Sequence, residues 1–273
     1  MNRNGINWKV TTLLILGTIL ILFPIYITVV NAFKTPQETA QSILALPSQL
    51  NFTNFTTAIE MTNFFNAFKN SFYITFFAVV FTLLTNSMVA YAIARNQHKK
   101  TFKFLYYYFV SALFVPFPII MLPIVKQMSA INLTNPTGLI FLYIVYGLAF
   151  NVFLYVGYIK AIPKELEEAA IVDGCSRWGV FWRIIFPLLA PMNATVGIFT
   201  ALWAWNDFLL PLVILSDRSH HTLPLVQYVF QSQFGTNYNL AFASYLLALL
   251  PMIIVYLFAQ KWIISGVTKG AIK

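Results

Sequence analysis

The sequence predicts an all-α integral membrane protein, and three observations support this fold class. Of the 273 residues, 59% are hydrophobic and only 9% are charged, whereas soluble domains carry about 25% charged residues. The mean hydropathy is +0.73. Six stretches are apolar over roughly 20 residues, the length that a helix needs to cross the hydrocarbon layer. Because every backbone polar group inside a bilayer needs an internal partner, we expect these stretches to be helices.

The predicted spans are Val10–Ala32, Ser71–Ala94, Phe104–Val125, Leu139–Tyr158, Met192–Leu215 and Ala241–Ala259. We expect the first to be a retained membrane helix, because no small-residue cleavage site follows a short apolar run. Prolines should bend the third span, and the fifth is expected to be one continuous helix. The outer loop after the first span is long enough for a short amphipathic helix, expected at Asn54–Phe68.

Basic residues indicate the orientation of the spans. With the N-terminus inside, thirteen of the 17 Lys and Arg residues lie in cytoplasmic segments, and four lie outside: Lys34, Lys69, Lys126 and Arg218. This bias follows the positive-inside rule, so both termini are predicted to be cytoplasmic. The net charge of +9 is then a consequence of topology, and no nucleic-acid partner is needed to explain it. The single cysteine, Cys175, excludes an internal disulfide.

The inner loop at 159–191 is longer than a simple connector. It contains four of the eight acidic residues, namely Glu165, Glu167, Glu168 and Asp173. Pro163 suits the first position of a helix, and acidic side chains in a first turn interact favourably with the helix dipole. A small apolar face is expected on this helix, formed by Leu166, Ala169 and Ala170.

A glycine corner should end this helix. Gly174 is placed to stop it in the left-handed conformation, and Ser176 is placed to cap a second helix that leads into the fifth span. The sequence therefore predicts a helix, a corner and a second helix at the cytoplasmic surface, a compact element suited to docking into a groove of another protein.

This loop resembles the EAA loop of binding-protein-dependent ABC importer permeases. The matching residues are Glu168-Ala169-Ala170, Asp173-Gly174, Phe181, Pro187 and Pro191. Further stretches are similar to the carbohydrate branch, the MalG-like or multiple-sugar permeases: Phe33-Lys34-Thr35-Pro36, Asn70-Ser71, Ala90-Tyr91-Ala92 with Arg95, Trp205-Asn206-Asp207-Phe208-Leu209, Gln260-Lys261-Trp262 with Gly266, and Gly270-Ala271-Ile272-Lys273. The resemblance covers nearly the whole chain. One departure is Cys175, where the family usually has alanine.

The resemblance implies a six-span, type I (MetI-like) importer fold in the cytoplasmic membrane. It divides the chain into a peripheral first span with its outer loop (1–70), a permease core (71–264) and a cytoplasmic tail (265–273). It also implies an ATPase-coupling role for five residues: Glu168, Ala169, Ala170, Asp173 and Gly174. The implied partners are a second, MalF-like permease, two ATP-binding subunits and an extracytoplasmic solute-binding protein, with a sugar as the solute and the lipid bilayer around the spans.

The sequence gives no sign of its own ATPase or metal chemistry. The nearest glycine spacing, Gly174 to Gly179, is followed by Val180 and Phe181, where a phosphate-binding loop needs Lys and Ser or Thr. ATP and Mg²⁺ are therefore expected in the partner subunits, with no cofactor in this chain. The three histidines have no Cys or acidic cluster at ligand spacing, so no metal site is expected.

Polar residues within the spans are candidates for the solute path. On a continuous fifth helix, one face would carry Trp203, Asn206, Asp207 and Leu210. Asp207 is open to two interpretations, direct contact with a sugar or a structural or gating role, and the second is favoured because the surrounding run is shared by sugar permeases of different specificity. Asn151 and Asn86 either line the path or bond to another helix.

Other classes of function remain open at this stage. An ion-gradient-driven transporter or a channel usually carries inverted repeats and ionisable groups near mid-membrane. No duplicated half is visible, and Asp207 is the sole candidate ion site. Within the importer class, a non-sugar solute such as glycerol phosphate is the alternative to an oligosaccharide. A membrane enzyme has the least support, because no catalytic cluster is visible.

Overall fold

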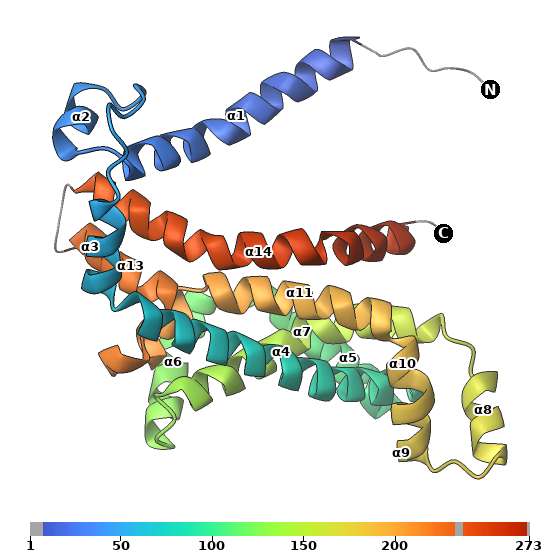
Figure 1. Ribbon diagram of the computed structural model, residues 1–273. Helices are drawn as coiled ribbons and strands as arrows, with labels where there is room; N and C mark the ends of the chain where they lie inside the picture. The colour runs from blue at the N-terminus through green and yellow to red at the C-terminus, as the bar shows by residue number, and fades with distance from the viewer. Residues whose placement is uncertain (1–7, 233–236, 272–273) are drawn as a thin grey trace. The chain divides into compact units, whose positions relative to one another are not determined.

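The computed structural model describes residues 8–232 and 237–271. Their regular structure is helical, without a β-strand in these two ranges, which confirms the all-α class (Figure 1). The chain divides into two compact units, one formed by residues 1–65 with 226–254 and the other by residues 66–225 with 255–273. The domain boundaries expected from the sequence, at 70 and 264, stay predictions.

Three helices begin the first unit: α1 (Trp8–Ala32), α2 (Pro36–Gln41) and α3 (Thr53–Thr62). Most side chains of α1 are apolar and exposed, and only its last three residues are buried. An uncovered apolar helix of 25 residues requires a lipid environment, as predicted for the first span. The expected helix at Asn54–Phe68 is interrupted, because Asn63 adopts the left-handed conformation (φ 46°) and ends α3.

The outer loop of this unit is ordered by hydrogen bonds rather than by a large core. A capping box at Thr35 and Glu38 starts α2. Bonds donated by Ser48 and by the backbone of Thr35 lower the pKa of Glu38 to about 2. Lys34 is 1% exposed, and its ammonium donates to the carbonyls of Ser42 and Ile43 at 2.9 and 3.4 Å. These bonds fix the path of the chain after α1.

The last helix, α14 (Tyr238–Ala271), contains the predicted sixth span. It is preceded by α13 (Leu223–Ser232). The segment Tyr238–Ile254 of α14 is an apolar helix that contributes to the first unit. There Asn239 donates to the carbonyls of Asn31 and Lys34 at 2.8 and 3.1 Å.

The second unit is built on two long helices, α4 (Phe64–Arg95) and α7 (Pro136–Lys160). Both are long and apolar enough to span a membrane by themselves, in agreement with the second and fourth predicted spans. Buried clusters lie near both ends of these helices, one around Tyr155 and Ile185 and the other around Tyr143.

The third span is broken into separate helices. It consists of α5 (Lys100–Ser111), a 3₁₀ turn η1 (Ala112–Phe114) and α6 (Phe117–Ala130), whose axes meet at 108°. Proline disfavours a helical conformation in the residue before it, and Val115 before Pro116 is extended (φ −91°, ψ 108°). The predicted effect of the prolines is therefore confirmed, and it extends to a complete break.

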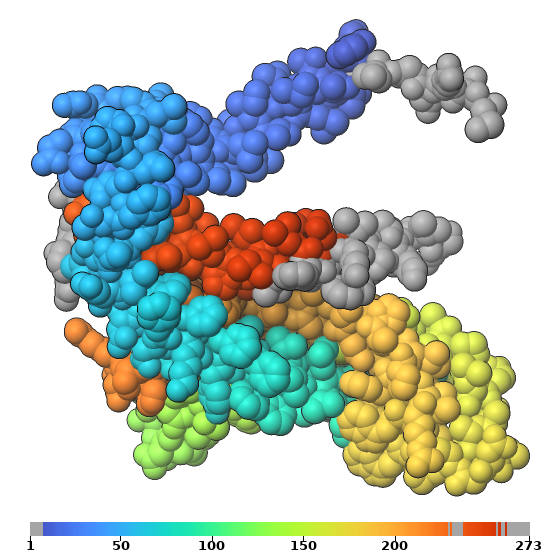
Figure 2. Space-filling view, in the orientation of Figure 1, coloured from blue at the N-terminus to red at the C-terminus, as the bar shows by residue number. Residues whose placement is uncertain are grey.

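The loop and the fifth span form a chain of short helices: α8 (Glu165–Val172), α9 (Arg177–Val180), the π-helical turn η2 (Phe181–Ile185), α10 (Phe186–Leu188), α11 (Ala190–Asn206) and α12 (Leu209–Ile214). The segment Arg177–Leu188 meets α11 at 75°. Figure 2 shows α8 and α9, in yellow, at one end of the second unit.

The expectation of one continuous helix at Met192–Leu215 is wrong. Asp207 is extended (φ −71°, ψ 133°) and separates α11 from α12. Pro211 supplies the physical reason, because a proline lacks the N–H that would bond to the carbonyl four residues earlier and its ring clashes with that carbonyl. That carbonyl belongs to Asp207, so the break falls at the acidic residue.

Candidate functional site

The predicted coupling loop begins with the short helix α8. It starts at Glu165, two residues after Pro163, with Lys164 at the N-cap and no side-chain cap. Three glutamates lie in its first turn, where they interact favourably with the N-terminal end of the helix dipole. An isolated helix of eight residues is marginal in water, so α8 depends on its contacts with the rest of the loop.

Gly174 ends α8 in the way that the sequence predicts. Its φ is +83°. Its N–H donates to the carbonyl of Ile171 at 3.0 Å, and the N–H of Cys175 donates to Ala170 at 2.9 Å. These two bonds define a Schellman motif, in which only glycine adopts the left-handed position without strain.

The chain leaves the corner through a second capped helix. The hydroxyl of Ser176 accepts the N–H of Gly179 at 3.1 Å, which confirms the predicted cap. Ala170 and Cys175 are partly buried and pack on the cluster that contains Phe181 and Ile185. The corner is therefore attached to the second unit by its small apolar side chains.

The outer surface of the loop is exposed and carries both apolar and acidic groups. Four of the five predicted coupling residues are exposed, and Ala170 is half-buried. Val172 is 86% exposed, and Leu166, Ile171 and Trp178 are exposed as well. Within residues 8–232 and 237–271, the carboxylates of Glu168 and Asp173 make no hydrogen bond or ion pair. We call the surface formed by Glu168, Ala169, Val172, Asp173 and Gly174 the docking face.

The predicted apolar face at Leu166, Ala169 and Ala170 is divided by the structure. Ala170 turns toward the cluster around Phe181, while Ala169 and Leu166 are exposed. The loop therefore uses one alanine to attach itself to the spans and leaves the other at its surface.

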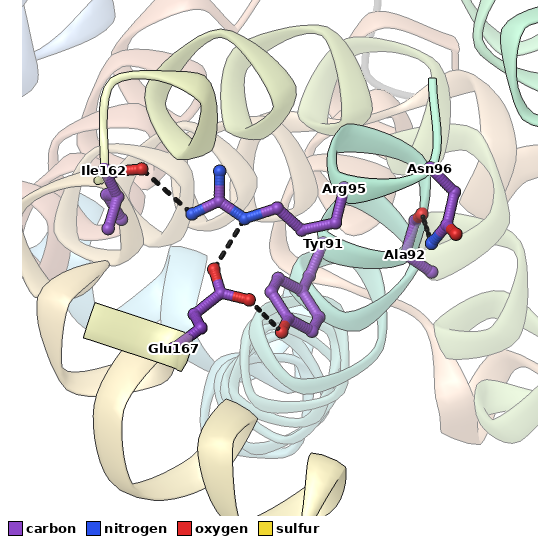
Figure 3. A network of polar contacts seen from close by, with 6 residues as sticks. All are labelled: Tyr91, Ala92, Arg95, Asn96, Ile162 and Glu167. Carbon is purple, nitrogen blue, oxygen red and sulfur yellow. Dashed lines mark hydrogen bonds and ion pairs between the residues drawn. The ribbon is translucent and has the colours of Figure 1, made fainter. Parts of the chain in front are cut away.

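A contact that sequence reasoning missed joins α8 to the inner end of α4. The carboxylate of Glu167 accepts a hydrogen bond from Arg95 Nε at 2.6 Å and one from the hydroxyl of Tyr91 at 2.6 Å (Figure 3). Arg95 Nη2 also donates to the carbonyl of Ile162 at 3.0 Å. The sequence contains all of these groups, but the spacing of 72 residues between Arg95 and Glu167 gives no signal that they pair.

The residues predicted for the solute path do not form a single face. Asn151 and Trp203 line one cavity of about 390 Å³ between α7, α11 and the 3₁₀ turn of the third span. Asn206 is exposed and donates to the carbonyl of Leu202 in its own helix at 2.8 Å. Asp207 is also absent from the residues that line the cavity.

The cavity combines aromatic walls with polar atoms that have no partner in the described residues. Phe150, Phe199 and Trp203 supply aromatic surface. The hydroxyl of Tyr146 and the amide nitrogen of Asn151 are buried without a hydrogen bond in the part of the chain that the structure describes. Buried polar groups are normally satisfied, and these two atoms are covered by protein rather than open to the cavity.

Asp207 is held inside the protein by two hydrogen bonds. Its carboxylate accepts the N–H of Leu209 at 3.1 Å and the hydroxyl of Tyr143 at 3.0 Å. The Tyr143 ring lies edge-on to Trp203, with centroids 5.1 Å apart. These contacts cap α12 and join it to α7, which favours the structural or gating interpretation of Asp207.

Comparisons with known proteins agree with this architecture. The family described as "Binding-protein-dependent transport system inner membrane component" matches residues 86–269, more than half of the chain. The chain is 42% identical over 269 residues to the "Multiple sugar-binding transport system permease protein MsmG" of Streptococcus mutans, covering 97% of this chain and 96% of that protein.

A second relative and a solved structure extend the likeness. The "Probable starch degradation products transport system permease protein AmyC" of Thermoanaerobacterium thermosulfurigenes is 38% identical, with 98% of this chain and 97% of that protein covered. A chain of a bacterial ABC transporter that imports alginate has the same fold, with a TM-score of 0.80 at 22% identity over 96% of this chain and 98% of that one.

The family match supports the importer interpretation and not the gradient-driven alternative. The matched region includes α7, the docking face and the broken fifth span. The chain belongs to the family of inner-membrane components of binding-protein-dependent transport systems, in agreement with the multi-pass membrane localisation predicted from its spans.

Proposed function

We propose that this chain is one permease subunit of an ATP-driven sugar importer, and that the imported sugars are oligosaccharides. ATP is hydrolysed in separate subunits that receive the docking face, and the solute passes between this chain and a second permease. The observation that carries the proposal is the exposed docking face at the Schellman corner, whose two carboxylates have no partner among the residues that the structure describes.

The chemistry of the docking face fits a groove with basic and apolar parts. The free carboxylates of Glu168 and Asp173 would meet cations of the ATP-binding subunit, and Val172 would enter an apolar recess. Small Ala169 and Gly174 allow the two backbones to approach closely. Protein–protein interfaces commonly have an apolar core and a polar rim, and the docking face has groups of both kinds.

The proposal of a sugar rests on the relatives and on the cavity. The two relatives above are named for multiple sugars and for starch degradation products, and a further one for arabinooligosaccharides. A sugar presents C–H faces that suit the aromatic surfaces of Phe150, Phe199 and Trp203, which line the cavity. We therefore propose that the cavity, rather than Asn206 or Asp207, provides this chain's part of the solute path.

The proposed partners are a second permease, two ATP-binding subunits and an extracytoplasmic binding protein. A transporter of the same fold has been solved in complex with a pentasaccharide-bound periplasmic protein, with a TM-score of 0.69. ATP and Mg²⁺ would be bound by the partner subunits.

The proposed mechanism is alternating access. ATP favours one of two conformations of the complex by bringing the nucleotide-binding subunits together, and the docking face moves with them. A ligand shifts an equilibrium only by its different affinity for the two states. ATP must therefore act on the spans through contacts that differ between the outward-open and inward-open states, and the docking face provides such a contact.

The test is sugar uptake by the full complex in vesicles, with the binding protein and a panel of labelled oligosaccharides. We expect ATP-dependent uptake of at least one sugar, and its loss in the Glu168→Lys, Gly174→Pro double variant together with weaker binding of the ATP-binding subunit. Glu60→Lys, at an exposed site in α3, is the matched control and should leave that binding unchanged. Uptake of glycerol phosphate instead of every sugar would overturn the sugar assignment, and uptake without the ATP-binding subunit would overturn the mechanism.

A further inference from the structure

We propose that Glu167, Arg95 and Tyr91 form a clasp that carries the movement of α8 into the second span, α4. The inference rests on the proposed function, because it concerns how the docking face passes its movement to the membrane helices. The clasp lies on the side of α8 that faces α4, with the Glu167 carboxylate directed between the Arg95 guanidinium and the Tyr91 hydroxyl (Figure 3).

The Glu167 carboxylate is held at both oxygens. Arg95 Nε donates to Oε1 and the Tyr91 hydroxyl donates to Oε2, each at 2.6 Å. The side chains of Arg95 and Glu167 are each 12% exposed. Hydrogen bonds to charged groups are short and strong, and partial burial limits competition from water. This contact therefore differs from an exposed ion pair, which contributes little to stability.

The clasp also holds the chain on both sides of α8. Before the helix, Arg95 Nη2 donates to the carbonyl of Ile162 at 3.0 Å. After it, the ring of Tyr91 packs against Phe181, with centroids 5.4 Å apart. A displacement of α8 away from the inner end of α4 must therefore break several contacts at once, which makes the two elements move as one body.

The helix α4 can pass such a displacement to the wall of the cavity. It is unbroken over 32 residues, and Asn86 lies roughly 13 Å from Arg95 along its axis at helical rise. Asn86 Nδ2 reaches the carbonyl of Ile144 in α7 at 3.4 Å. A Cβ built on Gly147 would lie 3.4 Å from that same nitrogen and 2.9 Å from Asn151 Nδ2. These distances place the Asn86 side chain of α4 next to Gly147 and Asn151, on the wall of the cavity.

The covalent route from α8 to the cavity is less rigid. It runs through the π-helical turn Phe181–Ile185 and the 75° bend before α11. A bend and a π-helical turn are positions where a helix can change direction. The clasp connects α8 to α4 without passing through the π-helical turn or the bend. It therefore transmits the movement of α8 directly, and the bend before α11 acts as a joint.

The experiment uses the reconstituted complex and four variants: Arg95→Glu, Glu167→Arg, the double exchange of both, and Glu60→Arg as an off-site charge-reversal control. Three quantities are measured, namely binding of the ATP-binding subunit, the rate of ATP hydrolysis, and solute transported per ATP. Each single variant should keep binding of the ATP-binding subunit and lower solute per ATP by about 5- to 150-fold, the range typical of coupling between sites. The double exchange should recover most of it, and Glu60→Arg should match the parent protein.

Two results would overturn the clasp. One is an unchanged ratio of solute to ATP in both single variants. The other is loss of ATP-binding-subunit association in the single variants without recovery in the double exchange, because the contact would then only shape the loop. If a charge reversal prevents membrane insertion, the variant Glu167→Gln is used instead, because glutamine keeps the size of glutamate and one acceptor oxygen. An unchanged ratio of solute to ATP in this variant also refutes the clasp. Failure of the proposed function is distinct, because the parent complex itself would then show no ATP-dependent uptake.

Discussion

Gly174 allows the coupling corner to be tested by backbone strain alone. A Cβ built at this position meets no atom within 4 Å, so a substitution to alanine adds no clash. The cost arises from the left-handed φ of +83°, which disfavours a residue with a Cβ by about 1–2 kcal/mol. Gly174→Ala should therefore lower the free energy of opening the corner by that amount. The population of the opened corner should rise by a factor of about 5 to 30.

Hydrogen exchange measures this population directly. The N–H of Cys175, bonded to the carbonyl of Ala170, should exchange about 5 to 30 times faster in Gly174→Ala, because exchange of a protected amide reports the free energy of local opening. In Gly174→Asn, the Cys175 amide should exchange much less rapidly than in the alanine variant, since asparagine tolerates the left-handed region. Gly174→Pro should open the corner fully, because proline loses the bond to Ile171 and fixes φ near −65°.

The matched control is Gly157→Ala in α7. Its Cβ also meets nothing within 4 Å, but its φ is in the ordinary range. Within a helix, alanine is more favourable than glycine by up to about 1 kcal/mol, so exchange in this last turn of α7 should slow. The argument from backbone conformation would be refuted if the Cys175 amide exchanged at the same rate in the parent protein, Gly174→Ala and Gly174→Asn.

Three further expectations concern single contacts. Gly179→Ala places a Cβ 2.6 Å from Cys175 Sγ and should lower stability by about 1–3 kcal/mol through overpacking, whereas adding Cys175→Ala should restore the melting temperature. Tyr143→Phe and Asp207→Ala should each destabilise the solubilised protein, by about 1.5–3 kcal/mol for a hydrogen bond to a charged group, and the double variant should lose less than the sum. Burial lowers the pKa of His221, so its loop should be better protected from exchange at pH 7.5 than at pH 5.5.

The sign of the pH effect follows from proton uptake. The opened loop binds a proton at His221 below its ordinary pKa, while the folded loop resists protonation, because the imidazole is partly desolvated and Arg218 lies near it. The contribution of His221 to the stability of the loop is therefore fully present above the ordinary pKa of histidine, and it decreases as the pH falls below that pKa. Asp217 and His220 are the other charged or titratable groups that act on the ring. His221→Gln should remove the difference between the two pH values, after correction for intrinsic exchange rates.

Local signals in the sequence determined much of the coupling loop. Gly174, Ser176 and the acidic first turn predict the corner, the cap and the helix, since each depends on residues a few positions apart. The prolines of the third span similarly predict a bend, which the structure extends to a break before Pro116. Pro211 carried an equally local signal for the break at Asp207, because a proline disturbs the carbonyl four residues earlier. The continuous-helix expectation overlooked that signal.

Composition and local pattern therefore determined the membrane class, the places of the long apolar helices α1, α4 and α7 and the shape of the coupling loop. Only the tertiary structure decided that Glu167, rather than Glu168, pairs with Arg95, that Tyr143 holds Asp207, and that Asn151 and Trp203 share a cavity without Asn206. The physical reason is separation along the chain. A cap or a proline acts through the backbone within one helical turn, whereas hydrogen-bonded partners that are 64 to 76 residues apart meet only because helix packing brings their faces together.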